Sequence, residues 1–232
     1  DLNIKLKENA KRTNNVNLKV STEFANLDWR YSLDGEYIYE TANNITDSHE
    51  YKLKPKLDFF FDDHWFLRSS VDIDYNMIDA GYLEIDYASG PGYRFWNDRQ
   101  RRLEIISQLG LERAYFRPEV WSNSDLFDDR IINYPFVSLG WDYRQPWTLW
   151  EEKFELFGKG SYEKFVDQPS PYLTRKQSVS GSLGLRYYFN DHLRLSWSSE
   201  LDWDDAWLDY HGLHRDVSEK EWRHLITLGA SF

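Results

Sequence analysis

Apolar and polar residues alternate along most of the chain, and the last eleven positions show the pattern clearly. Phe232, Leu228, Ile226 and Trp222 fall on one face, while mostly polar residues such as Thr227 fall on the other. A period of two is typical of a β-strand with one apolar face. About twelve segments of this kind follow one another, which predicts an all-β protein.

The connections between these segments alternate in length. Short turns are expected at 25–26, 62–64, 97–101, 144–148 and 190–191. Longer polar loops are expected at 41–48, 117–129, 166–175 and 208–219. Bacterial outer-membrane barrels have short turns at one end and long loops at the other, and an even number of strands places both termini on the periplasmic side.

Aromatic residues recur near both ends of the predicted strands, on the apolar face. At roughly 3.3 Å per residue and a tilt of about 40°, ten residues cover about 25 Å, which is the height of the apolar band of a membrane barrel. The pairs at this spacing are Tyr51 with Phe61, Trp65 with Tyr75, and Trp222 with Phe232.

We therefore predict a single domain over residues 1–232, an antiparallel transmembrane β-barrel of about twelve strands with both termini periplasmic. Pro55, Pro91 and Pro135 fall within predicted strands, where each removes a ladder hydrogen bond. We expect a β-bulge at each of them. Otherwise one or two segments are not strands and the barrel has ten.

Composition narrows the choice of protein class. Aromatic residues make up 18% of the chain, and no stretch is long and apolar enough for a transmembrane helix. No cysteine is present, which excludes disulfides and thiol chemistry. The net charge of −11 argues against nucleic acid as a partner. We expect an outer-membrane protein of a Gram-negative bacterium whose signal peptide has been removed.

One stretch carries a family resemblance. The Gly-Pro-Gly-Tyr-Arg strand at 90–94, the charged turn at 97–102, the strand at 103–112 and the stretch at 181–190 are similar to a known family. The chain resembles the YdiY-like family of salt-induced outer-membrane proteins, a domain of unknown function, over most of 27–232. The resemblance implies an outer-membrane barrel and supplies neither catalytic residues nor a substrate. A weaker likeness is to narrow twelve-stranded porins for acidic sugars, which line their pore with arginine.

The inward faces of the predicted strands carry charges of both signs, with acids in excess. We interpret them as the lining of a narrow porin-like channel for passive diffusion of small hydrophilic solutes, with a mild cation preference. The alternative is that they pair and plug the lumen, giving a closed barrel with a structural or partner-binding role. The candidate lining residues are Arg30, Asp34, Glu36, Lys52, Lys54, Lys56, Arg68, Asp72, Asp74, Glu84, Asp86, Arg94, Glu104, Glu112, Lys153, Glu155, Lys159, Arg186, Arg194, Glu200, Asp202 and Arg223.

Catalysis is not expected. His211 and His214 share a predicted loop with Asp209 and Asp216, but no recognised triad or ligand spacing accompanies them. We predict no catalytic, cofactor or metal site. Gly90 and Gly92 lie in a strand without a following helix, so they are expected to relieve crowding rather than bind phosphate.

Partners are expected at the membrane. Trp222, Leu228 and Phe232 form a predicted assembly signal, by which the barrel-assembly machinery recognises the C-terminal strand. Outer-membrane lipid and lipopolysaccharide are expected around the barrel. In the loop at 117–129, Trp121, Leu126 and Phe127 could contact lipopolysaccharide or a protein partner, or fold into the barrel mouth.

Overall fold

The structure is a computed structural model. It describes residues 2–9, 13–42, 45–78, 81–96, 101–117, 131–168, 173–190, 193–210 and 213–230. For residues 2–9, 13–15, 17, 42, 45, 47, 208–210, 213 and 230 it describes the backbone alone. All regular structure in these ranges is β-strand. The strands are β1 (Leu2–Asn9), β2 (Thr13–Ala25), β3 (Trp29–Ala42), β4 (Ile45–Phe60), β5 (Trp65–Asn76), β6 (Gly81–Arg94), β7 (Arg102–Phe116), β8 (Ile131–Leu149), β9 (Glu152–Phe165), β10 (Leu173–Tyr188), β11 (Leu193–Tyr210), β12 (Leu213–Asp216) and β13 (Glu219–Ala230).

The strands form one antiparallel sheet in which each pairs with its neighbour in sequence from β1 to β11. Both β12 and β13 pair with β11, β12 beside Trp207–Tyr210 and β13 beside Leu193–Asp204. They are two parts of one twelfth strand, interrupted at Val217 and Ser218. The prediction of an antiparallel all-β barrel with about twelve strands is therefore confirmed.

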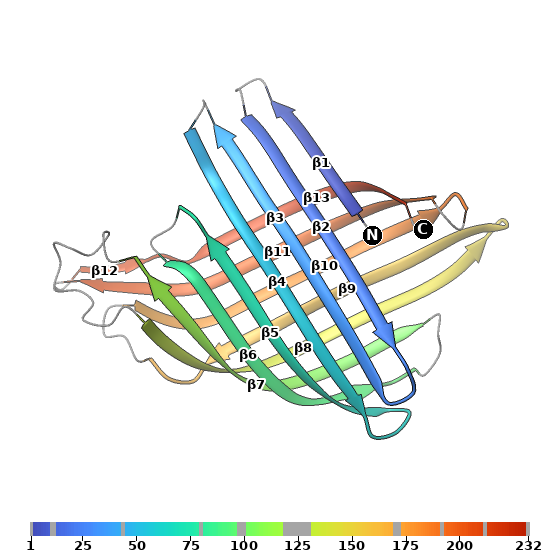
Figure 1. Cartoon of the computed structure of the whole chain (residues 1–232), viewed down its shortest axis with the longest axis horizontal. Coiled ribbons are helices and arrows are strands. Elements are labelled where there is room, and N and C mark those ends of the chain that lie inside the picture. The colour runs from blue at the N-terminus through green and yellow to red at the C-terminus, as the bar shows by residue number, and fades with distance from the viewer. Residues whose placement is uncertain are drawn as a thin grey trace.

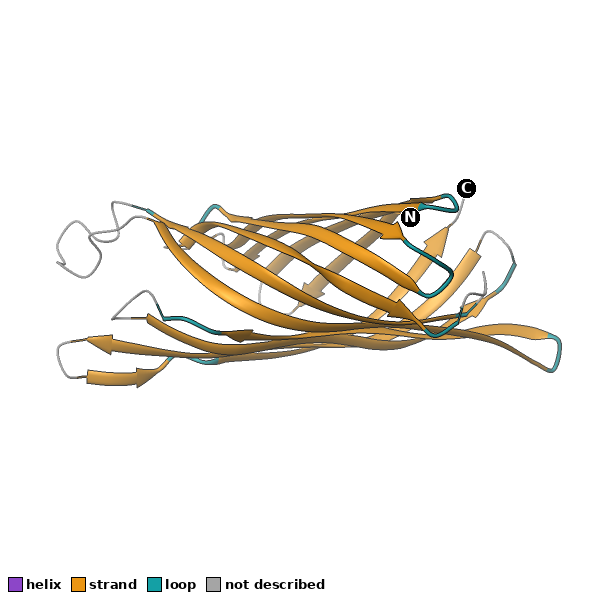
Figure 2. Cartoon of the chain, turned by 90° about the horizontal axis from the view of Figure 1, so that it is seen from below, coloured by secondary structure: helices purple, strands orange, loops and turns teal. Residues whose placement is uncertain are grey.

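The sheet curls round on itself, so that β13 comes next to β1 (Figure 1). Within the described residues no ladder joins these two strands, and a seam runs between them. The ion pair of Lys19 on β2 with Glu200 on β11, at 3.8 Å, bridges this seam from the inside. The start of β1 and the end of β13 lie at the same end of the sheet (Figure 2). We call this the short-turn end and the opposite one the long-loop end.

Alternation sets the two faces of the sheet as predicted. Trp65, Leu67 and Leu109 point outward and are 49%, 40% and 72% exposed. Phe66, between Trp65 and Leu67, points inward and is buried. Ile106, which has the opposite parity to Leu109 on β7, also points inward and is buried. The part of the chain that the structure describes contains no helix long and apolar enough to cross a membrane.

Three connections at the short-turn end share one local design. The side-chain oxygen of Asn26 accepts hydrogen bonds from the backbone N–H groups of Asp28 and Trp29. Asp62 does the same for His64 and Trp65, and Asn190 accepts from Leu193. Asn and Asp favour such turns because their short side chains replace a backbone acceptor.

The turn predicted at 144–148 is wrong. β8 continues to Leu149, with Arg144 opposite Phe157 and Pro146 opposite Glu155. The chain turns instead at Trp150 and Glu151, whose φ angles are 48° and 70°. Two residues with positive φ make the tight hairpin turn that fits the twist of the strands, but Asn and Gly usually occupy it. Trp150 and Glu151 are not typical turn residues, so the sequence did not predict a turn there. The proline in Gln145-Pro146 is a typical turn residue and led to the wrong position.

The β-bulges predicted at Pro55, Pro91 and Pro135 are also absent. Their registers are kept, and each proline stays paired on one side, with Leu33, Leu67 and Leu111 respectively. A strand residue points its N–H toward one neighbour only, so proline weakens one ladder and leaves the other intact. The register shifts lie elsewhere, at Glu40/Thr41, Gly81/Leu83 and Arg175/Gln177.

Candidate functional site: the lumen of the barrel

The predicted lining residues meet on the inner face of the sheet, mostly in ion pairs. Eighteen of them form ion pairs within 4.0 Å: Arg30, Asp34, Glu36, Lys52, Lys54, Lys56, Arg68, Asp72, Asp74, Glu84, Arg94, Glu104, Glu112, Glu155, Arg186, Glu200, Asp202 and Arg223. Asp86 lies between Asp72 and Glu112 in register. Lys153 is exposed beside the β8–β9 turn, Lys159 is exposed opposite Asp142, and Arg194 packs over Gly229.

The short-turn end holds a compact network that we call the arginine lock: Arg30, Asp58, Arg68, Arg94 and Glu104. Arg30 donates two hydrogen bonds to Glu104, at 2.8 and 2.7 Å, and a third to Asp58 at 2.7 Å. Arg68 donates to Asp58 at 2.7 and 3.0 Å, and Arg94 donates to Glu104 at 2.9 Å. Charge-assisted, bidentate bonds of this kind are the strongest that proteins make.

The centre of the arginine lock is enclosed, while Arg68 and Arg94 at its edge are partly exposed. Arg30, Asp58 and Glu104 are only 4%, 2% and 0% exposed. The guanidinium of Arg30 lies 5.4 Å from the ring centre of Phe60 and 5.6 Å from that of Phe66. Since Arg30 is on β3 and Glu104 on β7, the network crosses the concave side of five strands and narrows the lumen there.

Further ion pairs extend this constriction. Arg102 on β7 reaches Glu23 on β2 at 2.9 Å, and Asp142 on β8 at 3.5 Å. Arg102 was not among the predicted lining residues, although it has the same inward parity as Glu104. Phe60 and Phe66 were missed for a different reason: both sit beside outward aromatic residues at a turn, where alternation is hard to follow.

Glycine makes room for the inward rings. A Cβ at Gly92 would lie 2.2 Å from the Phe66 ring, and one at Gly110 would lie 2.2 Å from the Phe136 ring. In both cases the glycine is the register partner of the phenylalanine. Rings packed over cross-strand glycines stabilise curved sheets. Gly92 therefore relieves crowding, as predicted, and Gly90 does so where β6 closely approaches the backbone of Ser107.

Near the long-loop end, the inner wall carries a small apolar cluster of Ile132, Tyr134, Phe136 and Phe165. The inward direction of Tyr134 and Phe136 agrees with their parity in the sequence. The guanidinium of Arg175 packs 4.8 Å from the Phe165 ring centre, and it donates to Glu112. Arg175 was predicted to lie in a loop, because two prolines precede it, so its contact with Glu112 was not expected.

Acids predominate on the wall beside this cluster. Asp72, Asp86 and Glu112 are successive register partners on β5, β6 and β7, so three carboxyl groups stand side by side. Like charges directly opposite each other destabilise a sheet. The lysine of the pair Lys54–Asp72 and the guanidinium of Arg175 compensate only part of this charge.

The opposite wall contains an open cavity, which we call the acidic vestibule. It has a volume of about 410 Å³ and lies between β3–β4 and β11–β13. Six carboxylates and two cationic side chains line it, together with Ile38 and Ser48. These charged residues are Glu40, Glu50, Lys52, Asp202, Asp204, Glu219, Glu221 and Arg223.

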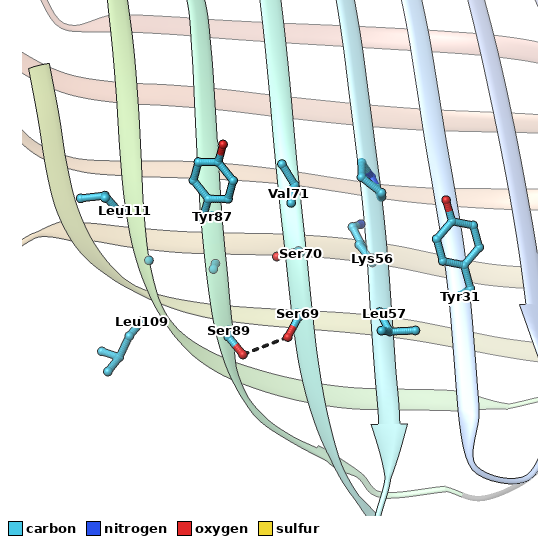
Figure 3. Close-up of a pocket in the computed structure, with 13 residues that line it drawn as sticks. Tyr31, Lys56, Leu57, Ser69, Ser70, Val71, Tyr87, Ser89, Leu109 and Leu111 are labelled. Carbon is cyan, nitrogen blue, oxygen red and sulfur yellow. Dashed lines mark hydrogen bonds between the residues drawn. The ribbon is translucent and has the colours of Figure 1, made fainter. Parts of the chain in front are cut away.

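A second hollow, of about 610 Å³, lies on the outer face and not in the lumen (Figure 3). Tyr31, Leu57, Tyr87 and Leu109 border it, and the hydroxyls of Ser69 and Ser89 meet at its floor, 3.1 Å apart. It lies over Pro55, where the ladder between β4 and β5 is interrupted. Its apolar border suits a surface covered by hydrocarbon.

No arrangement for catalysis emerges from the described residues. His214 stacks on Trp207 at 4.5 Å, while His211 and the side chain of Asp209 lie outside what the structure describes. Among the described side chains, no group of three or more His, Asp or Glu could hold a metal ion. Of the predicted assembly signal, Trp222 and Leu228 are exposed on β13, and Phe232 lies outside the described residues. The loop residues Trp121, Leu126 and Phe127 also lie outside the described residues.

A curved antiparallel sheet of this kind, apolar outside and charged inside, defines an antiparallel β-barrel. Among solved structures, the NanC porin shares this fold. The NanC porin is 14% identical over 100% of both chains, with a TM-score of 0.55. The unliganded ferric citrate transporter FecA is 12% identical, covering 98% of this chain and 40% of that chain, with a TM-score of 0.41.

The family follows from the sequence itself. Residues 4–212 match the model of the family described as "Protein of unknown function, DUF481". The match covers most of the chain, so the protein belongs to this family. A search of curated proteins gives no match.

Proposed function

We propose that the protein is an outer-membrane channel for passive diffusion of small hydrophilic solutes, with a mild preference for cations. The acidic vestibule carries the proposal. Six carboxylates face two cationic groups around about 410 Å³ of open space inside the barrel. A cleft lined by one sign of charge, with low-dielectric walls, focuses the field and concentrates ions of the opposite sign.

The membrane location belongs to the same proposal. The outer face is apolar between two aromatic belts, as a barrel in hydrocarbon requires. Leu109, Ile226 and Leu228 are 72%, 73% and 62% exposed there. We place the short-turn end in the periplasm of a Gram-negative bacterium. The barrel-assembly machinery would then recognise Trp222, Leu228 and Phe232 on the C-terminal strand.

The resemblance to salt-induced outer-membrane proteins adds a physiological element. We propose that expression of this protein rises with external salt, which an immunoblot of cells grown at several salt concentrations would check. We also propose that the protein is not an enzyme and uses no cofactor.

The arginine lock favours a second candidate, the closed barrel. Its buried ion pairs are self-contained and cross the inside of five strands, as a plug would. In this reading the barrel is a structural or partner-binding component of the outer membrane, and the acidic vestibule is a closed-ended recess.

Single-channel recording of the refolded protein in a planar bilayer separates the two candidates. Stepwise openings and a reversal potential of cationic sign in a salt gradient would support the channel. A silent bilayer, with folding verified by heat-modifiable migration and circular dichroism, would refute it and favour the closed barrel.

A further inference from the structure

The aromatic belts on the outer face differ in chemistry. At the long-loop end the rings form a continuous tyrosine girdle: Tyr37 contacts Tyr51 at 5.0 Å, Tyr51 contacts Tyr75 at 6.3 Å, Tyr75 contacts Tyr82 at 6.2 Å, and Tyr82 contacts Tyr115 at 6.4 Å. His49 joins it, with its Nε2 atom 3.2 Å from the Tyr51 hydroxyl. Every member can form hydrogen bonds with polar headgroups.

The short-turn end carries a girdle rich in Trp and Phe instead. Trp29 contacts Phe59 at 4.6 Å, and Phe59 contacts Phe61 at 5.3 Å. Farther round the barrel, Trp147 contacts Phe154 at 6.0 Å. Tyr93, Tyr143 and Tyr187 also belong to it, and each contacts a Trp or Phe ring. The short-turn girdle is therefore mixed, whereas the chain of contacts from Tyr37 to Tyr115 joins tyrosines to one another.

Basic side chains accompany the belt at the long-loop end. Arg113, Arg117, Lys164, Lys176 and Lys220 lie near the long-loop ends of β7, β9, β10 and β13. Arg113, Arg117, Lys164 and Lys220 alternate with the inward residues of their strands, so they point outward. Lys176 lies within the register shift at Arg175/Gln177, and its contact with the outward Trp207 ring places it on the outer face too. We call these five residues the basic band. Arg113 and Arg117 adjoin the tyrosine girdle at the end of β7. Lys164, Lys176 and Lys220, which are exposed, continue round the barrel over β9, β10 and β13.

Several members of the basic band rest on aromatic rings. The guanidinium of Arg117 lies 5.5 Å from the Tyr82 ring centre, and the amine of Lys176 lies 4.8 Å from that of Trp207. The amine of Lys220 lies 5.9 Å from the Trp222 ring centre. Long basic side chains at a membrane surface lay their stems along apolar rings and hold their charge at headgroup depth.

The charges at the short-turn end are different. Asp28, Asp62, Asp63 and Glu151 are exposed in its described turns. Arg101 is also exposed there and packs 5.6 Å from the Trp96 ring centre. The chain has a net charge of −11. Asp205 and Asp216 also lie on the outer face at the long-loop end, beside Trp207. The five basic residues exceed these two acids and indicate an anionic surrounding at that end.

We propose that the basic band and the tyrosine girdle form a docking surface for the phosphate groups of a phosphorylated glycolipid in the leaflet at the long-loop end. Arginine and lysine pair with phosphate by charge-assisted hydrogen bonds, and basic side chains are attracted to an anionic membrane surface. Tyrosine hydroxyls suit the sugar hydroxyls of the same headgroup. The inference rests on the proposed membrane location but not on conduction.

The test is a thermal unfolding series in neutral detergent micelles. Bis-phosphorylated lipid A should raise the Tm of the native protein, and added salt should weaken this shift. The variant R113Q/K164Q/K176Q/K220Q should lose most of the shift. Dephosphorylated lipid A should have a small effect on either protein.

A matched pair of single variants protects the test against misfolding. K176Q and R101Q each remove one cation from above a tryptophan ring, at opposite ends of the barrel. K176Q should reduce the lipid A shift, and R101Q should leave it unchanged. Equal shifts for K176Q and R101Q, or equal shifts with and without the phosphates, would overturn the proposal. Loss of the shift in a protein that still conducts in a glycolipid-free bilayer would leave the channel proposal intact.

Discussion

The two ends of the lumen differ in how their charged side chains are stabilised: by buried ion pairs at one end and by solvent at the other. At the short-turn end, Arg30, Asp58 and Glu104 satisfy one another in a space closed to solvent. At the long-loop end, the acidic vestibule leaves carboxylates such as Glu221 and Asp204 largely exposed, with side chains 62% and 49% accessible. Desolvated charges tolerate enclosure only when they are paired, whereas hydrated ones can remain in excess.

This difference separates stability from selectivity along one barrel. A buried pair that loses a partner leaves an uncompensated charge in a low dielectric, so the short-turn end should dominate the free energy of unfolding. Exposed carboxylates contribute little to stability but set the field that a permeating ion meets. The predictions below test this division.

The largest effect is expected at the centre of the arginine lock. Glu104→Gln removes the carboxylate that receives two hydrogen bonds from Arg30. It should lower the free energy of unfolding by about 3–5 kcal/mol, measured by urea titration in lipid vesicles. Glu221→Gln, in the acidic vestibule, is the control and should cost less than about 1 kcal/mol. Similar losses for both variants would contradict the contrast between the ends.

The next largest effect concerns the glycines beneath the inward rings, which occur at both ends. Gly92→Ala would collide with Phe66, and Gly110→Ala with Phe136. Overpacking of this kind costs about 1–3 kcal/mol. At Gly140, also on the inner face, the nearest atom to an added Cβ is 3.6 Å away. Gly140→Ala should therefore unfold at the same urea concentration as the native protein.

How far the sequence predicts this structure depends on the range of the interaction. Alternation is local, and it predicted the twelve-strand antiparallel plan, the two faces and most of the short turns. The longer loops expected at 41–48 and 208–219 were wrong, because β3 pairs with β4 up to Ala42 and Ile45, and β11 pairs with β12 up to Tyr210 and Leu213. The correct turn at Trp150–Glu151 depends on positive φ angles in residues that rarely adopt them, which no local pattern announces. Pro55 stays in register because the N–H that proline lacks would have pointed toward β5, so its pairing with Leu33 on β3 is not affected. The sequence does not show which of the two neighbouring strands that N–H would face.

The site was predictable as a list of inward residues but not as an arrangement. Parity along each strand placed Arg30 and Glu104 inside. Their pairing across the lumen depends on curvature that brings β3 and β7 together, and curvature is a property of the whole sheet. The same holds for Arg175, whose partner Glu112 lies on another wall. The excess of acids was evident from composition, but its concentration in the acidic vestibule was not.

A smaller effect is expected from the acidic vestibule itself. The variant D202N/D204N/E219Q/E221Q should remove the cation preference while channel conductance persists, read as a shift of the reversal potential toward zero. The difference from the native protein should be larger below 0.1 M salt, where the Debye length exceeds about 10 Å. Asp63→Asn and Glu151→Gln, in exposed turns at the other end, form the control. A reversal potential unchanged in the fourfold variant would place selectivity elsewhere.

The smallest effect is expected at Asp62, outside the lumen, where charge and turn geometry can be separated. Asp62 accepts hydrogen bonds from the backbone N–H groups of Trp65 and His64, and these hold the pKa of its carboxyl below the usual value. A depressed pKa in the folded state gives stability that is present above the unfolded pKa of about 3.9 and is lost as pH falls through the folded value. Asp62→Asn keeps the acceptor oxygen, as Asn26 and Asn190 do in the equivalent turns. The variant should therefore match the native protein closely at low pH and be slightly less stable at neutral pH. Urea midpoints measured between about pH 2 and 7 would show this, and a constant difference across that range would mean that the carboxylate charge has no part in the turn.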